Sequence, residues 1–340
     1  MKRRRVGVAV SSPDAGELRD PATHAAYAGV VACGEEAAAA LRSAGHDAFV
    51  VIVRRAIAPA IAALRDGGAD VVVNFVEELG GDADGEIRFA RALESASIPF
   101  TGSRAPALRL ALDKAASKRA LARAGVPVPR FAAFERGADV AWSERDLPAI
   151  VKPSREDGSL GIDRGSVCFD VESVRRRVDR VARTFAQPAI VERFVDGREL
   201  NVAMLEGRRL PISEIEFGGA ASRPRIVTFA SKWKPGSADD LATRPVCPAR
   251  VDAALERRLR RVAARAFRAL GLRDYARIDV RVDERSDPYV LEANPNPDLA
   301  ASAGFARAAR AAGISTAALY ARLVARAAAR AERATAPATR

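Results

Sequence analysis

Histidine and cysteine are scarce in this chain of 340 residues, which has two histidines and three cysteines. Cys33, Cys168 and Cys247 lie far apart and form neither a disulfide framework nor a CxxC metal-binding pair. His24 and His46 are too few for a zinc enzyme with several histidine ligands, or for a histidine-based triad. General acid–base catalysis by histidine is therefore nearly excluded.

Long hydrophobic runs are missing as well. The sequence begins with MKRRR, but the apolar run VGVAV that follows is too short for the core of a signal peptide. No window of the sequence reaches the length of a transmembrane helix. We therefore expect a cytoplasmic protein that does not interact with membranes.

Aromatic residues are few, at 6% of the chain, although the net charge is +12. The arginines are spread along the whole sequence, and no aromatic platform for stacking bases is evident. These features disfavour a nucleic-acid partner. The positive potential would instead favour a small anionic ligand.

The first hundred residues alternate between strand and helix patterns. Near-continuous apolar strands separated by helices predict an α/β domain with a parallel sheet covered on both faces. Ligands bind such sheets at the carboxyl ends of the strands, so the loops at 11–20 and 77–86 are candidate substrate loops. GGDADG (80–85) lacks the GxGxxG spacing, so there is no dinucleotide fingerprint. The expected strands are 5–10, 47–53, 70–76 and 98–103, and the expected helices are 25–44, 56–66 and 86–96.

A helix expected at 106–124 ends at Gly125, and VPVP after it indicates an extended linker to a new unit. We predict an N-terminal domain over 1–104, a central subdomain over 105–196 and a C-terminal subdomain of α+β character over 197–330. The last residues, 331–340, are expected to be disordered. Further strands are expected at 149–153, 166–169, 189–195, 199–206 and 209–217, and further helices at 171–184 and 252–270.

The segment YARIDVRVDERSDPYVLEANPNPD (275–298) predicts a hairpin that gathers polar side chains. Side chains alternate along a strand, so Arg277 and Asp279 share one face, as do Val290, Glu292 and Asn294. Symmetric pairing places 279 opposite 292 and 277 opposite 294. Two opposed carboxylates repel each other, and a set of oxygen donors suits Mg²⁺. An ordinary solvated hairpin face is the alternative.

Two other segments have the character of nucleotide-binding loops, each with a plain structural alternative. In KPSREDGSLGI (152–162), glycines and Ser159 allow backbone N–H groups to approach phosphate oxygens, although a simple turn fits equally well. In VERFVDGREL (191–200), the strand ends after Glu192, and the backbone of 193–195 can bind an adenine edge. Glu199 is placed to hold ribose hydroxyls.

The chain resembles the ATP-grasp ligases, and specifically the D-alanine–D-alanine ligase group. The resemblance rests on motifs in the expected order along most of the chain: TGS (101–103), LDK (112–114), SK (117–118), KPSREDGSLG (152–161), ERFVDGRE (192–199), SKW (231–233), RID (277–279) and EANPNP (292–297). It implies an ATP-grasp fold preceded by a Rossmann-like parallel-sheet domain.

The resemblance also implies roles for particular residues. Lys114, Lys152 and Lys232 would neutralise nucleotide phosphates, and Arg277 would stabilise the transferred phosphoryl group. The remaining implied roles are adenine binding by Glu192, Phe194, Val195 and Leu291, and binding of two Mg²⁺ ions, or Mn²⁺, by Asp279, Glu292 and Asn294. A carboxylate substrate would attack ATP to give an acyl phosphate, which an amine would then intercept. Related ligases are commonly dimers, so a homodimer is expected.

Several positions depart from the dipeptide-ligase pattern. Glu77-Glu78 replaces a His-Gly pair, Gly158 replaces a serine and Trp233 replaces a tyrosine. Asp298 stands where a glycine helps to form the oxyanion hole. We therefore expect a carboxylate–amine ligase with substrates other than two D-alanines, of which the acids would favour an amine-bearing or cationic one. The alternatives are a true D-alanine–D-alanine ligase and a nucleotide-binding protein without catalytic activity.

The segment 231–248 is long and polar, and we expect it to be a loop without regular structure. Its position matches the lid that closes over the reacting centre in the ATP-grasp ligases. Closure would keep water from a hydrolysable acyl phosphate.

Overall fold

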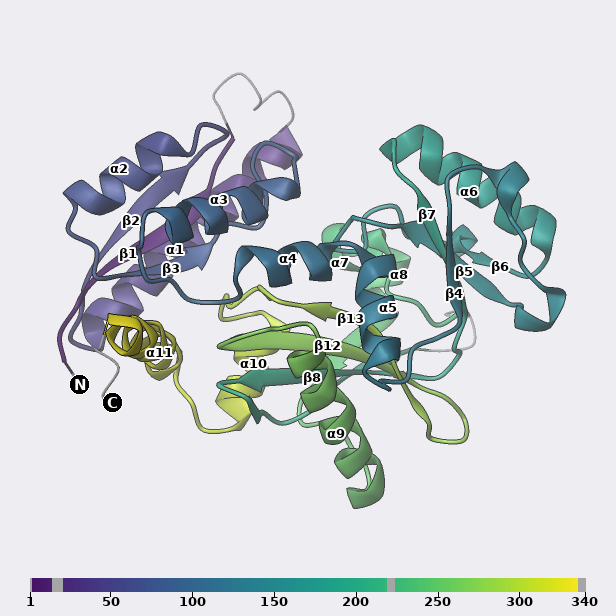
Figure 1. Ribbon diagram of the computed structural model, residues 1–340. Helices are drawn as coiled ribbons and strands as arrows, with labels where there is room; N and C mark the ends of the chain where they lie inside the picture. The colour runs from purple at the N-terminus through teal and green to yellow at the C-terminus, as the bar shows by residue number, and fades with distance from the viewer. Residues whose placement is uncertain (1, 14–20, 219–223, 336–340) are drawn as a thin grey trace, which may run out of the picture.

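The computed structural model describes residues 2–13, 21–218 and 224–335, which form three sheets that follow one another along the chain (Figure 1). In the first sheet, β1 (Arg5–Ser11) lies between β2 (Asp47–Val53) and β3 (Val71–Phe75), and both pairings are parallel. The helices of this part are α1 (Pro21–Ser43), α2 (Ala58–Asp66) and α3 (Asp84–Ser95). The parallel sheet predicted for the N-terminal part is thus confirmed.

Alternation along β1 explains why helices cover both faces of this sheet. Val6, Val8 and Val10 are fully buried against α1 and the C-terminal helix α11 (Thr316–Thr335). Ala9 points to the opposite face, into a core shared with α2 and α3. Because α11 packs against α1, the end of the chain returns to the N-terminal sheet (Figure 1).

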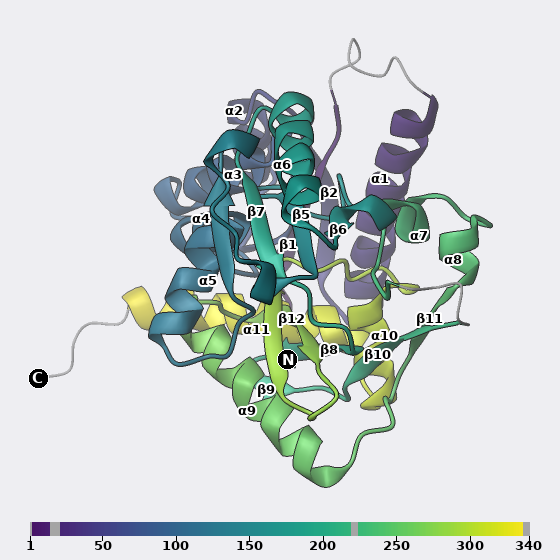
Figure 2. The same cartoon turned by 90° about the vertical axis from the view of Figure 1, so that its right-hand side faces the viewer.

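The second sheet has four antiparallel strands in the order β4 (Phe131–Phe134), β7 (Ala189–Arg193), β5 (Ala149–Pro153) and β6 (Val167–Cys168). One face is covered by α6 (Val171–Phe185), whose Val174, Val178 and Val181 are buried against the strands (Figure 2). Single-turn helices lie at Gly137–Asp139, Glu144–Asp146 and Arg164–Ser166.

The third sheet runs β11 (Thr243–Val246), β10 (Ser213–Phe217), β8 (Arg198–Leu205), β12 (Tyr275–Val282) and β13 (Pro288–Asn294), with β9 (Arg208–Arg209) paired to β8. Helix α9 (Ala253–Ala269) buries the apolar stripe of Leu255, Leu259 and Val262 on this sheet, as its spacing predicts. Between β13 and α11 lies α10 (Gly304–Ala311).

Two predicted elements differ in the structure. The helix expected at 106–124 is divided into α4 (Ala105–Leu112) and α5 (Lys114–Arg123), because Asp113 leaves the helical conformation and caps α5 by accepting a hydrogen bond from the Ala116 N–H (2.9 Å). The segment 98–103 is no strand, since only Phe100 forms a bridge, with Val72.

The expectation that 231–248 has no regular structure is wrong. Helices α7 (Phe229–Trp233) and α8 (Ala238–Leu241) cover its first part, and β11 then pairs with β10. Hydroxyl caps from Thr228 and Ser237 begin the two helices, a local signal that can be found in the sequence. Disorder was also predicted for 331–340, but α11 continues to Thr335; residues 336–340 lie outside the described part of the chain.

Candidate active site

The hairpin of β12 and β13 brings the predicted metal ligands together. Arg277 pairs with Asn294 and Asp279 with Glu292, which confirms the predicted register. A bulge follows, so that Val280 pairs with Val290 instead of Leu291. Val290 is therefore fully buried in the core under α9, and the prediction that it shares the polar face with Glu292 is wrong.

The charges on this hairpin are closely compensated. The Arg277 guanidinium donates to both oxygens of Asp279, from Nε at 2.7 Å and from Nη2 at 2.8 Å, and Asn201 donates to Asp279 Oδ1 at 2.7 Å. Burial opposes ionisation of Glu292, but nearby positive charges, first that of Lys114, lower its pKa to about 2. Glu292 is thus held as an anion at neutral pH, and the Asp279 carboxylate is paired with a guanidinium.

The donor chemistry of these residues fits Mg²⁺. Two carboxylates and the Asn294 amide oxygen form a set of oxygen donors, which is the set that a hard divalent cation prefers. Within the part of the chain that the structure describes, no group of three or more His, Cys, Asp or Glu is arranged to hold a metal.

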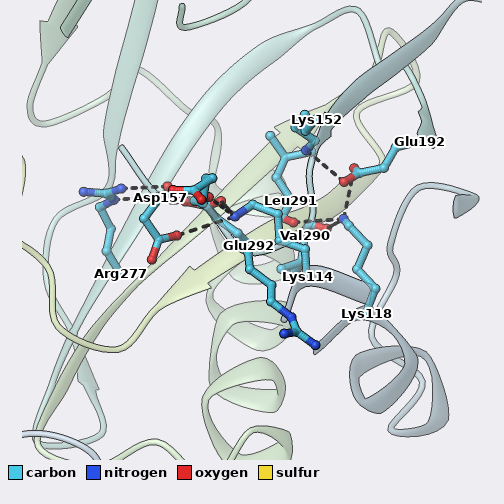
Figure 3. Close-up of polar contacts among 12 residues, drawn as sticks. Lys114, Lys118, Lys152, Asp157, Glu192, Arg277, Val290, Leu291 and Glu292 are labelled. Carbon is cyan, nitrogen blue, oxygen red and sulfur yellow. Dashed lines mark hydrogen bonds and ion pairs between the residues drawn. The ribbon is translucent and has the colours of Figure 1, made fainter. Parts of the chain in front are cut away.

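Three lysines meet between the second and third sheets (Figure 3). Lys152 on β5 and Lys118 on α5 both contact Glu192, with Nζ–Oε distances of 2.8 Å and 3.1 Å. Burial opposes ionisation of Glu192, but the two ammonium groups keep its pKa below the usual value. Lys118 also donates to the Leu291 carbonyl at 2.9 Å, so it ties the second sheet to β13. Lys114, at the start of α5, lies 3.9 Å from Glu292 Oε2.

Lys118 was not among the residues predicted for the site, although the SK motif at 117–118 contained the signal. Burial lowers its pKa to about 8, against the opposing charge of Glu192. Its contacts show that the Glu192 side chain is held in an internal ion cluster. If Glu192 binds adenine, its backbone must therefore do so.

The glycine-rich loop takes backbone conformations that its sequence permits. Gly158 and Ser159 have φ of 62° and 65°, in the left-handed region. Gly161 has no room for a side chain, because a Cβ there would lie 2.8 Å from Phe185 and Pro153. Trp233 of α7 donates from Nε1 to the Gly158 carbonyl at 2.9 Å, so the predicted lid segment is hydrogen-bonded to the loop.

Phe194 and Val195, predicted to bind adenine, and Glu199, predicted to bind ribose, lie directly after β7 and on β8, which belong to different sheets. Phe194 and Val195 follow β7 and are buried, and Phe194 packs with Val167 and Ile226 in a small apolar cluster. Glu199 on β8 is paired with Arg281 at 2.9 Å, so a ribose would have to share this carboxylate.

The predicted substrate residues Glu77, Glu78 and Asp298, here called the acidic set, come from two distant parts of the chain. Glu77 and Glu78 follow β3, whereas Asp298 follows β13. The Glu77 side chain is exposed. Desolvation of its carboxylate by the surrounding protein, and next the negative charge of Asp298, raise its pKa to about 7. Asp298 is also exposed, and its Oδ1 accepts a hydrogen bond from the Ala300 N–H at 2.7 Å. The structure thus places Glu77 and Asp298 in one electrostatic environment.

Asn296 is a second residue of the site that sequence reasoning missed. Its N–H donates to Asn294 Oδ1 at 2.9 Å, and its side chain accepts from the Tyr275 hydroxyl at 2.6 Å. The Asn296 Nδ2 donates to the Val76 carbonyl at 3.4 Å, directly before Glu77. Asn296 therefore links the predicted metal ligand to the N-terminal domain.

The site combines an oxygen donor set, buried lysines and a glycine-rich loop. It lies between two antiparallel sheets that follow a parallel-sheet domain along the chain. This arrangement defines an ATP-grasp enzyme. Residues 120–325 match the family model described as the D-ala D-ala ligase C-terminus. The chain belongs to the D-alanine–D-alanine ligase family. It is an ATP-dependent ligase that forms a carbon–nitrogen bond, and enzymes of this family use ATP and Mg²⁺.

Curated relatives match most of the chain. A D-alanine–D-alanine ligase of Desulforudis audaxviator is 34% identical, over 83% of this chain and 88% of its own length. The uncharacterized protein y4sG of Sinorhizobium fredii is 32% identical, over 82% of each chain. A D-alanine–D-alanine ligase structure from Bacillus anthracis, complexed with ATP, has a TM-score of 0.75 over 98% of this chain and 100% of its own, at 20% identity. That likeness shows the fold alone.

No helix in the described ranges combines the length and apolar character needed to span a membrane. The cytoplasmic location stays a prediction.

Proposed function

We propose that this ligase joins a carboxylate to an amine other than a second D-alanine, and that the acidic set selects an amine-bearing or cationic substrate. The observation that carries the proposal is that the charge of Asp298, which follows the predicted metal hairpin, acts on Glu77 at the end of β3. Carboxylates there would attract an ammonium group before reaction.

The proposed chemistry uses no covalent enzyme intermediate. The substrate carboxylate attacks the γ-phosphorus of ATP, which gives an acyl phosphate and ADP. The neutral amine then attacks the acyl carbon, the tetrahedral intermediate expels phosphate, and the amine loses a proton. Bound Mg²⁺ would neutralise phosphate charge when held by Asp279, Glu292 and Asn294. We propose two such ions, with Mn²⁺ as a possible substitute.

The side chains of this chain supply charge and orientation. Lys114, Lys152 and Lys232 would contact the phosphates, and Arg277, fixed by Asp279, would stabilise the developing charge on the transferred group. Trp233 would keep the lid against the glycine-rich loop. Water exclusion by that lid protects an acyl phosphate from hydrolysis.

The test is a coupled assay of phosphate release with ATP, Mg²⁺ and a panel of amino acids and amines, singly and in pairs. We expect ATP consumption with a pair that contains a cationic or diamino substrate, and little with D-alanine alone. In the E77Q and D298N variants the KM for that amine should rise about tenfold, because a charge-assisted contact is lost. E135Q, an exposed carboxylate of the central subdomain, is the matched control.

A second candidate function is the synthesis of D-alanyl-D-alanine itself. It is favoured by relatives such as that of Desulforudis audaxviator, whose name is D-alanine–D-alanine ligase. Efficient turnover of D-alanine alone would establish it and contradict the cationic-substrate proposal. ATP binding without turnover of any pair would instead favour a non-catalytic nucleotide-binding protein. We further propose a homodimer, which sedimentation can test.

A further inference from the structure

Asp157, in the glycine-rich loop, forms an ion pair with Lys114, a lysine of the proposed phosphate site. Its Oδ1 lies 3.5 Å from Lys114 Nζ, compared with 3.9 Å for Glu292 Oε2 (Figure 3). The Lys114 side chain is 6% exposed, whereas that of Asp157 is 63% exposed. Lys114 also donates a hydrogen bond to the backbone carbonyl of Glu156. The loop therefore provides two oxygen partners for a buried ammonium group.

A nucleotide phosphate and the Asp157 carboxylate would compete for the same positive charges. Both Lys114 and Lys232 act electrostatically on Asp157, and both also act on Glu292. Two anions beside one ammonium repel each other, and the phosphate carries the larger charge. Asp157 is exposed and precedes two residues with left-handed φ, Gly158 and Ser159, so its side chain can turn away from Lys114 without leaving a core.

Asp157 also interacts electrostatically with acids of the N-terminal domain. Its charge acts on Glu77 at the end of β3 and on Glu86 in α3. A carboxylate displaced from Lys114 would therefore still act electrostatically on Glu77 of the acidic set. Three carboxylates in that region would repel one another, and a bound cation would reduce this repulsion.

We propose that Asp157 is a specificity-determining counter-ion: it occupies Lys114 until a nucleotide phosphate replaces it, and then joins the acidic set that receives the amine. The second half of this proposal rests on the proposed function. Nucleotide binding thereby prepares the amine site, so ATP binds before the amine. A surface carboxylate with no such role would affect neither ligand, since exposed ion pairs contribute little.

The test is D157N, which keeps the size of the side chain and removes its charge. The matched control is E135Q, which removes the charge of an exposed carboxylate that directly follows β4 in the same subdomain. Binding of Mg²⁺ with a non-hydrolysable ATP analogue is measured by calorimetry without any amine. We expect D157N to bind the analogue about fivefold more tightly, as loss of one competing ion pair predicts, and E135Q to stay within about twofold of the unchanged protein.

The KM for the amine found in the substrate panel should move the other way in D157N, rising about tenfold with a smaller change in kcat. Tighter binding of the ATP analogue together with a higher KM for the amine is a result that simple structural damage would not produce. Unchanged or weaker analogue binding in D157N, an equal gain in E135Q, or an unchanged amine KM would overturn the proposal. Since the calorimetry needs no amine, failure to find an amine substrate would contradict the proposed function and leave the binding result intact.

Discussion

Replacement of Glu192 by glutamine tests how the proposed nucleotide site is held together. The Glu192 side chain is 1% exposed and lies between Lys118, also 1% exposed, and Lys152, 9% exposed. Glutamine has nearly the same shape but no charge, so E192Q leaves two buried ammonium groups without their shared anion. Loss of one partner from a buried ion pair costs about 3–5 kcal/mol. We expect E192Q to lose about 4 kcal/mol of its free energy of unfolding near neutral pH.

This loss should depend on pH in a defined direction. Burial lowers the pKa of Lys118 to about 8, and Glu192 opposes that shift. Without Glu192 the pKa of Lys118 falls further, so the lysine becomes neutral as the pH rises and no longer requires a counter-ion. Because the folded variant then binds fewer protons than its unfolded chain, its stability rises with pH. The difference between E192Q and the unchanged protein should therefore be smaller at about pH 9 than at about pH 6.

Urea unfolding followed by tryptophan fluorescence measures this difference. Trp142 is buried in the core of the same subdomain, and the substitution W233F removes the signal of the other tryptophan. E135Q, with an exposed carboxylate on the same subdomain, is the control. The reasoning would be refuted by a loss below about 1 kcal/mol, the value of an exposed ion pair, or by a loss that does not change with pH.

Three further predictions concern the metal hairpin, the lid and an isolated histidine. D279N should lower phosphate release by about 10²–10³-fold with an unchanged circular dichroism spectrum, and wild-type turnover would contradict the metal role. W233F removes the hydrogen bond to Gly158, which is worth about 1 kcal/mol. Limited trypsin digestion should therefore cut the lid about fivefold faster. An unchanged cutting rate would contradict the proposal that this hydrogen bond holds the lid against the glycine-rich loop. Burial lowers the pKa of His46 below 6.5, so its protonation favours the unfolded chain and the protein should lose stability as the pH falls below about 6.5. H46L should flatten that dependence in thermal melts at several pH values, whereas parallel curves for the two proteins would argue against it.

The parts of the fold that depend on local pattern were predictable. The alternation of apolar residues in β1 and the apolar stripe of α9 each indicate one buried face. The register of the hairpin follows from symmetric pairing about its loop. The bulge at Leu291 was not predictable in this way. Alternation assumes one residue per position on each strand, and Val290 gains a fully buried place under α9 only when one residue is added.

The helix break at Asp113 shows a similar limit. Apolar spacing continues across 106–124, but the Asp113 side chain satisfies the N–H of Ala116 and begins a new helix. That break places Lys114 at the first position of α5, beside the glycine-rich loop. The capping residue Asp113 thus sets the position of Lys114, a lysine of the proposed phosphate site.

The substrate end resisted prediction because its residues are positioned across domains. Asn296 holds Asn294 through its backbone and reaches Val76, beside Glu77, through its side chain. A change in the position of Glu77 would consequently be felt at the predicted metal hairpin, and the reverse also holds. The nucleotide end is defined by contacts that motifs encode, but amine selection depends on how the N-terminal domain and the hairpin meet. Substitutions that alter the substrate of this ligase should therefore preserve the hydrogen bonds of Asn296 while they change the charges of the acidic set.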